Sequence, residues 1–185
     1  KRACIIADKI IAISEATKKD LIRFYGVNPQ KVVVIYQDCL PQFYDKTKLG
    51  IDVKSKYNLT KPYLLCTGTI ESRKSQLDLV RAFEELEFDG ELILLGKKTS
   101  YYSQIEDYLK DKKELKLKVR VLSNADFEDF PALYKNASLF VYPSICEGFG
   151  IPILEALNTG VPVITTKGTV MEEAGQDAVS YFEPK

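Results

Sequence analysis

Short apolar runs recur along the chain, and segments with helical periodicity lie between them. A continuous apolar run is typical of a strand that is buried on both faces of a sheet. The runs predict strands at residues 9–13, 32–35, 63–67, 92–95, 119–122, 139–142, 161–165 and 181–182. The intervening periodicity, caps and stops predict helices at residues 14–26, 53–57, 76–86, 102–112, 131–135 and 152–158. This alternation indicates an α/β fold with a Rossmann-like, doubly wound parallel sheet.

In a doubly wound sheet the ligand lies at the carboxyl ends of the strands, near the point where the strand order switches. The loops at these ends follow Thr67, Leu95, Leu122, Tyr142 and Thr165. Functional side chains are therefore expected in these loops.

The loop after residue 142 has the features of an anion site. Gly148 and Gly150 flank Phe149, and a predicted helix begins close to Ile151. Glycine lets the backbone approach a ligand closely, and the first amides of a helix point outward. The helix dipole adds roughly half a positive charge at this end, so these four residues are candidates for binding a phosphate.

Two carboxylates accompany these amides. Glu147 precedes the glycines and Glu155 lies about one turn into the helix. A carboxylate can accept two hydrogen bonds from a vicinal diol, which sugars and ribose both offer. The alternative is a tight strand-to-helix turn in which the dipole merely favours Glu155.

The loop after residue 67 combines glycine with adjacent cations. Gly68 and Thr69 follow the strand, and Arg73 and Lys74 precede the next helix. These residues could clamp a diphosphate, although adjacent cations are also common in solvated turns. The chain has neither a GxGxxG turn here nor a GxxxxGK[ST] loop, which argues against dinucleotide and P-loop binding.

A third loop follows residue 122. Ser123 and Asn124 could contact a nucleobase edge, but both residue types are also common in turns.

Composition excludes several other classes of site. Lysine plus arginine equal aspartate plus glutamate at 26 each, so the global charge gives no indication of nucleic-acid binding. The absence of histidine excludes a His-based triad within the chain, and together with the four widely spaced cysteines it argues against a metal site. Free thiols suit the reducing cytoplasm. No apolar stretch approaches the roughly 20 residues that a membrane span requires.

Together the loops resemble the retaining GT-B glycosyltransferases, a family with many mannosyl- and glucosyltransferases of surface polysaccharide synthesis. The family hallmark is a pair of glutamates within a segment like PSxxEGFGxPxxEAxxxGxPVI. The matching residues are Pro143, Ser144, Glu147, Gly148, Phe149, Gly150, Pro152, Glu155, Ala156, Gly160, Pro162, Val163 and Ile164. Residues 7–14, 68–74 and 137–144 also resemble family segments, the second of them a mannosyltransferase-like GTIExRKN turn.

The resemblance implies a role for each of these side chains. Glu147 would contact donor-sugar hydroxyls and Glu155 would hold the ribose. Residues 148–150 would offer backbone amides to the sugar and phosphates, and Arg73 and Lys74 would neutralise the diphosphate.

Three departures from the family pattern affect the detailed contacts. Thr69 stands where many members have arginine, Ser75 where glycine or asparagine is usual, and Ser123 where glycine often ends the strand. These substitutions concern the phosphate and base contacts rather than the existence of the site.

The resemblance also implies how the chain is divided. Residues 1–42 would be the last β-α-β unit of an N-terminal acceptor-side domain, and 43–61 a connector. Residues 62–185 would be the donor-binding C-terminal domain of a GT-B fold, so the chain is expected to be a fragment truncated at both ends.

The implied enzyme is a metal-independent hexosyltransferase without a cofactor. It would transfer a sugar from a GDP- or UDP-sugar to a hydroxyl of a glycan or lipid-linked acceptor, with retention of configuration. The acceptor would bind through the missing domain, and the full-length protein would be cytoplasmic or peripheral at the inner face of the membrane. The main alternative is a non-catalytic nucleotide-sugar-binding module that needs a separate acceptor-domain chain; a GT-B-like epimerase or phosphorylase fits less well.

Overall fold

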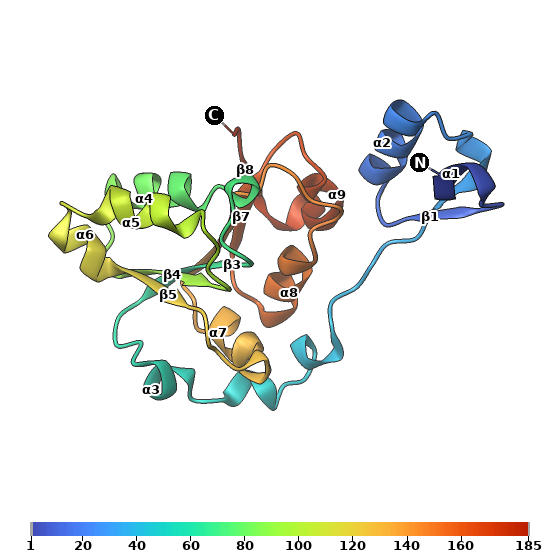
Figure 1. Cartoon of the computed structure of the whole chain (residues 1–185). Helices are drawn as coiled ribbons and strands as arrows, with labels where there is room; N and C mark the ends of the chain where they lie inside the picture. Colours follow the sequence, from blue (N-terminus) through green and yellow to red (C-terminus); the bar gives the residue numbers. More distant parts are fainter. Residues whose placement is uncertain (1, 185) are drawn as a thin grey trace.

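The computed structural model describes residues 2–184, which form two parallel sheets (Figure 1). The smaller sheet pairs β1 (Ile10–Ala12) with β2 (Val32–Val34). The larger sheet has six strands in the order β5-β4-β3-β6-β7-β8, and every neighbouring pair is parallel. Its strands are β3 (Tyr63–Thr67), β4 (Glu91–Leu95), β5 (Val119–Leu122), β6 (Leu139–Tyr142), β7 (Val163–Thr166) and β8 (Ser180–Phe182).

The strand order of the larger sheet reverses between β3 and β6. From β3 the chain proceeds outward through β4 to β5, and then returns to place β6 on the other side of β3. β3 and β6 pair with each other, with Leu65 opposite Phe140. The loops that follow these two strands therefore start side by side, at the point where doubly wound sheets bind ligands.

Helices cover both faces of the six-stranded sheet. One face carries α4 (Gln76–Glu84), α5 (Tyr102–Leu109) and α6 (Lys113–Lys118), whose apolar residues pack against Leu64, Cys66 and Leu92. The other face carries α7 (Phe130–Lys135), α8 (Ile151–Thr159) and α9 (Met171–Gly175). The sheet therefore lies between two helical layers with an apolar core on each face, as the sequence predicts for a doubly wound fold.

The first sheet belongs to a small unit, residues 2–34, which also contains α1 (Arg2–Ile6) and α2 (Glu15–Tyr25). Ser14 caps α2 through a hydrogen bond from Thr17 N to its side-chain oxygen, and Gly26 ends the helix at a φ of 65°. These two features of the structure confirm the helix start and the helix end that the sequence predicts at residues 14–26. The sequence patterns predict no helix at residues 2–6, where the structure has α1.

The segment that links the two units is packed rather than loose. It contains α3 (Val53–Tyr57) and short 3₁₀ turns at Pro41–Phe43 and Lys48–Gly50. Phe43, Val53 and Leu59 are almost fully buried in the core on the α7–α8 face.

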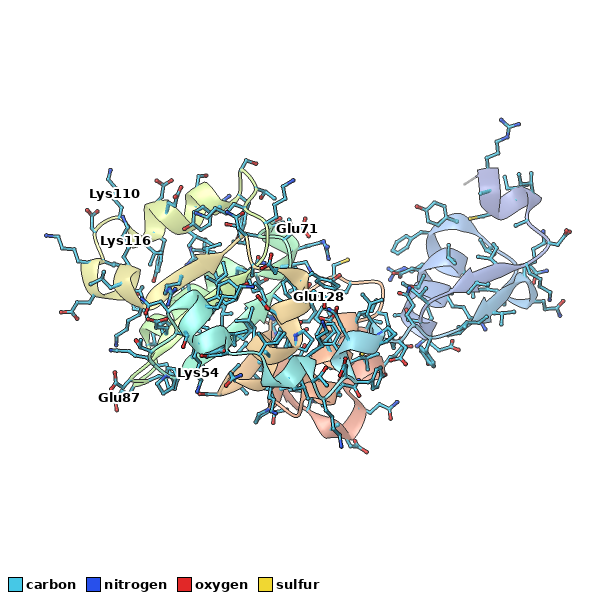
Figure 2. The ribbon with its side chains drawn as sticks, turned by 90° about the horizontal axis from the view of Figure 1, so that it is seen from below. Lys54, Glu71, Glu87, Lys110, Lys116 and Glu128 are labelled. Atoms are coloured by element: carbon cyan, nitrogen blue, oxygen red, sulfur yellow. The ribbon has the colours of Figure 1, made fainter. Side chains whose placement is uncertain are left out.

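The large unit turns several charged side chains outward. Figure 2 shows Lys110 and Lys116 on its outer rim, on the side away from the small unit and away from Glu71.

Among residues 2–184, none of the helices has the length and apolar character needed to cross a membrane.

Candidate active site

The loops after β3 and β6 are joined directly. The backbone amide of Ile145 donates to the carbonyl oxygen of Arg73 at 2.9 Å, and the hydroxyl oxygen of Ser144 lies 3.2 Å from the same carbonyl oxygen. The two most informative loops of the sequence therefore form one structural unit at the switch point.

Glu147 is the centre of this unit. Its Oε1 accepts hydrogen bonds from Lys74 Nζ at 2.8 Å and from the hydroxyls of Tyr142 and Ser144 at 2.9 Å each. Its Oε2 lies 2.7 Å from Nη1 of Arg73. Burial alone would raise the pKa of the Glu147 carboxyl, but the hydrogen bonds from Lys74 and Arg73 outweigh burial and lower the pKa to about 2. Glu147 is therefore ionised at neutral pH.

The two cations differ in exposure. Lys74 is buried and also donates to the Tyr142 hydroxyl at 2.9 Å, whereas Arg73 is 42% exposed at its side chain. Arg73 also bridges Glu71 at 2.7 Å and donates to the carbonyl of Cys146 at 2.8 Å. Lys74 thus holds Glu147 in place, while Arg73 is the cation that solvent can reach.

Gly68 makes room for this arrangement. Its φ is 113°, and a Cβ at this position would lie 2.9 Å from Lys74 Nζ. A side chain at Gly68 would therefore push the ammonium group away from Glu147. Thr69 follows with an exposed side chain, and its carbonyl oxygen accepts from the Gln76 amide at 3.0 Å.

Glu155 belongs to a second hydrogen-bonded group. Its Oε2 accepts from the Tyr134 hydroxyl at 2.7 Å, and Tyr134 also lies 2.8 Å from the hydroxyl of Thr67, the last residue of β3. Burial raises the pKa of the Glu155 carboxyl, and the hydrogen bond from Tyr134 opposes that shift. This chain of contacts fixes Glu155 relative to the end of the central strand.

Tyr134→Phe is expected to lower the free energy of unfolding by about 1–3 kcal/mol, because it leaves Thr67 and Glu155 without a buried hydrogen-bond partner. Urea denaturation would measure the loss. The exposed Tyr25 provides the matched control, and Tyr25→Phe should change stability little. Equal losses in the two variants would contradict the role assigned to Tyr134.

The glycine loop leads into α8 as the sequence predicts. Gly150 precedes the helix with a φ of 134°, and Ile151 is the first helical residue. The ring of Phe149 is buried and stacks on Tyr36, with the two centroids 5.4 Å apart. The side chain of Phe149 therefore anchors the loop.

The remaining candidates lie farther along the sheet edge. Ser123 and Asn124 are exposed at the end of β5, the outermost strand on that side, and are not brought together with the Glu147 network. Sequence reasoning assigned no role to Tyr142, Ser144 and Tyr134. Tyr142 and Ser144 flank Pro143 in the same motif as Glu147, so that motif could have indicated them as site residues. The sequence around Tyr134 contains no motif that indicates a contact with the site.

A sequence model for the family described as glycosyl transferases group 1 matches residues 47–184. The chain is 30% identical over 183 residues to the O-antigen chain mannosyltransferase B of Escherichia coli, covering 96% of this chain and 48% of that protein. It is 29% identical over 175 residues to the O-antigen chain mannosyltransferase RfbU of Salmonella typhimurium, covering 95% and 46%. The chain therefore spans about half the length of these curated relatives.

Solved structures show the same fold. The structure of Anabaena Alr3699/HepE in complex with UDP-glucose matches with a TM-score of 0.85 at 20% identity, covering 98% of this chain and 51% of that chain. WaaG, a glycosyltransferase involved in lipopolysaccharide biosynthesis, matches with a TM-score of 0.78 at 22% identity, covering 95% and 49%. These matches confirm the predicted α/β fold of the GT-B type. The family model covers most of the chain and its mannosyltransferase relatives align with nearly all of it, so the chain belongs to the glycosyl transferases group 1 family.

Proposed function

We propose that this chain supplies the donor-binding half of a glycosyltransferase that uses a nucleoside diphosphate sugar. The observation that carries the proposal is the meeting of Glu147, Arg73 and Lys74 at the switch point, beside a glycine loop that opens a helix. Such a place offers cations, amides and a carboxylate to a ligand that is anionic at one part and rich in hydroxyls at another. Its family relatives act on O-antigen chains, which supports a role in polysaccharide synthesis.

Each part of the site has a chemical task in this proposal. The partly exposed Arg73 and the backbone of residues 148–151 face the diphosphate, whose negative charge grows as the sugar departs. Glu147, held ionised, accepts hydrogen bonds from sugar hydroxyls, and Glu155 accepts from the ribose. Fixed cations and amides take the place of a metal ion, so we propose a metal-independent transfer. Retention of configuration and a GDP- or UDP-linked donor remain part of the proposal.

We further propose that the small unit belongs to the acceptor-side domain. Its strands expose large apolar side chains, with Ile11 65% and Val33 45% exposed. Such side chains on a two-stranded sheet are expected to pack against further structure. In this division residues 1–42 belong to the acceptor side, 43–61 connect and 62–185 bind the donor. The four cysteines are free thiols, which supports the predicted cytoplasmic location.

Isothermal titration calorimetry with GDP, UDP and ADP tests the proposal. One of these nucleotides should bind the wild-type chain, and Arg73→Ala should weaken that binding about tenfold because a charge-assisted contact with phosphate is lost. Arg73→Ala with Lys74→Ala should weaken it further, and circular dichroism would check that the double variant folds. Arg23 carries the same type of side chain on α2 of the small unit, so Arg23→Ala is the control. Absence of binding by the folded wild-type chain would reject the proposal.

A further inference from the structure

The glycine loop is held on one side by the first turn of α2. The carbonyl oxygen of Gly148 accepts hydrogen bonds from the hydroxyls of Ser14 at 2.7 Å and Thr17 at 3.1 Å. A Cβ at Gly148 would lie 2.8 Å from Cδ1 of Ile13, so the small unit approaches the loop as closely as glycine allows. Ser14 is fully buried in this contact although it belongs to a different unit from Gly148.

The loop is held on its other side by α9. A Cβ at Gly150 would lie 3.1 Å from Cβ of Ala174 and 3.4 Å from Sδ of Met171. Met171 is completely buried and Ala174 is nearly so, which anchors α9 in the core of the large unit. The glycine loop is therefore contacted at Gly148 by α2 of the small unit and at Gly150 by α9 of the large unit.

One side chain connects these two helices directly. Glu173 of α9 accepts hydrogen bonds from the backbone amides of Glu15 at 2.7 Å and Ala16 at 2.8 Å. These are first-turn amides of α2, which have no partner within the helix, and the positive end of the helix dipole favours a carboxylate there. Figure 1 shows α2 of the small unit next to α9 of the large unit.

The contacts form a closed ring that runs from α2 to Gly148, along the loop to Gly150, through α9 and back through Glu173 to α2. The peptide group that follows Gly148 is planar, with its carbonyl oxygen and the amide hydrogen of Phe149 pointing in opposite directions. Holding the Gly148 oxygen toward α2 therefore aims the Phe149 amide away from α2. The ring sets the direction of an amide that the proposed function assigns to the donor.

We propose that Glu173 is a positioning residue for the donor site. It fixes α2 against α9 and so fixes the glycine loop between them. This inference rests on the proposed function, because it gives the loop a ligand to bind. Glu173 itself need not touch that ligand.

The experiment compares the wild-type chain with Glu173→Gln and Glu173→Ala in two measurements. Hydrogen exchange reports whether the amides of Glu15 and Ala16 remain protected, and calorimetry with GDP and UDP reports nucleotide affinity. The two amides bind different oxygens of Glu173, and glutamine keeps the size of the side chain but replaces one of these oxygens with an NH₂ donor, so one of the two amides faces a donor instead of an acceptor. Asp177→Asn is the control, because it removes an exposed carboxylate shortly after α9.

Both Glu173 variants should lose protection at the α2 amides and bind nucleotide about tenfold more weakly, with alanine the weaker of the two. Asp177→Asn should match the wild type in both measurements. Lost protection with unchanged nucleotide affinity would show that the ring is only structural and would overturn the inference while leaving the proposed function intact. A wild-type chain that binds neither nucleotide would overturn the proposed function, and this inference with it.

Discussion

Glu147→Ala is expected to lower the free energy of unfolding by about 3–5 kcal/mol at pH 7, because it leaves the buried ammonium of Lys74 without its carboxylate. Tyr142 and Ser144 lose their shared acceptor in the same step. Urea denaturation of the two chains would measure the difference. Glu183→Ala is the matched control, since Glu183 is 76% exposed and only bridges Lys167 at the surface. A loss of stability no larger than that of the control would contradict the conclusion that Glu147 is the centre of this hydrogen-bonded network.

The proposed function predicts that the same substitution abolishes sugar transfer when this chain is joined to the proposed acceptor-side domain, as a transfer assay would measure. Glu147→Gln keeps the size of the side chain, removes its charge and replaces one acceptor oxygen with an NH₂ donor.

The stability that the charge contributes should depend on pH in a defined direction. The pKa of Glu147 is lowered from its ordinary value of 4.5 to about 2, so its contribution is complete above about pH 4.5 and is lost as the pH falls toward 2. The wild-type chain should therefore exceed Glu147→Gln in stability at pH 7, and the gap should close between these two values. A gap that stays constant down to pH 2.5 would contradict this assignment.

Gly96→Ala is expected to destabilise the large unit by about 3 kcal/mol or more. A Cβ at Gly96 would lie only 2.2 Å from the carbonyl oxygen of Gly68 and 2.6 Å from its carbonyl carbon, and this neighbour is backbone that cannot rotate away. The clash adds to the strain of a φ of 157°. Because Gly68 leaves room for Lys74, the distortion should also reach the Glu147 network.

Thermal and urea unfolding would measure the effect, with Gly50→Ala as the matched control. A Cβ at Gly50 meets no atom within 4 Å, so this variant should be nearly neutral. If Gly96→Ala proved as stable as Gly50→Ala, the close approach of the two backbone segments would be wrong.

The central strands could be predicted closely because burial on both faces gives them unbroken apolar runs. The strands at 63–67, 119–122 and 139–142 have the predicted bounds. The helix predicted over 102–112 begins at Tyr102 as predicted but ends three residues early, at Leu109, and a separate helix α6 follows from Lys113. α6 was missed because its sequence alternates lysine with Leu115 and Leu117, a period of two that is typical of strands. Leu117 is 79% exposed, so its apolar character does not report burial.

The meeting of Glu147 with Arg73 and Lys74 could be predicted because loops at the switch point of a doubly wound sheet lie together. The contact of Glu155 with Tyr134 could not, since it joins two helices whose periodicity marks only their buried faces. The contact of Glu173 with α2 could not be predicted either, because α9 is too short to show a helical period and the partners of Glu173 lie in the other unit.

The packing of the linking segment limits which of its residues could act as a hinge between the two units. Cys39, Phe43 and Val53 are buried with the large unit, and β2 of the small unit ends at Val34. Residues 36–38 lie between Ile35, whose amide donates to the carbonyl of Ala12 in β1 at 2.9 Å, and the buried Cys39, and Tyr36 among them stacks on Phe149. A movement of the small unit about these residues would shift Tyr36 against Phe149, so it would be transmitted directly to the glycine loop.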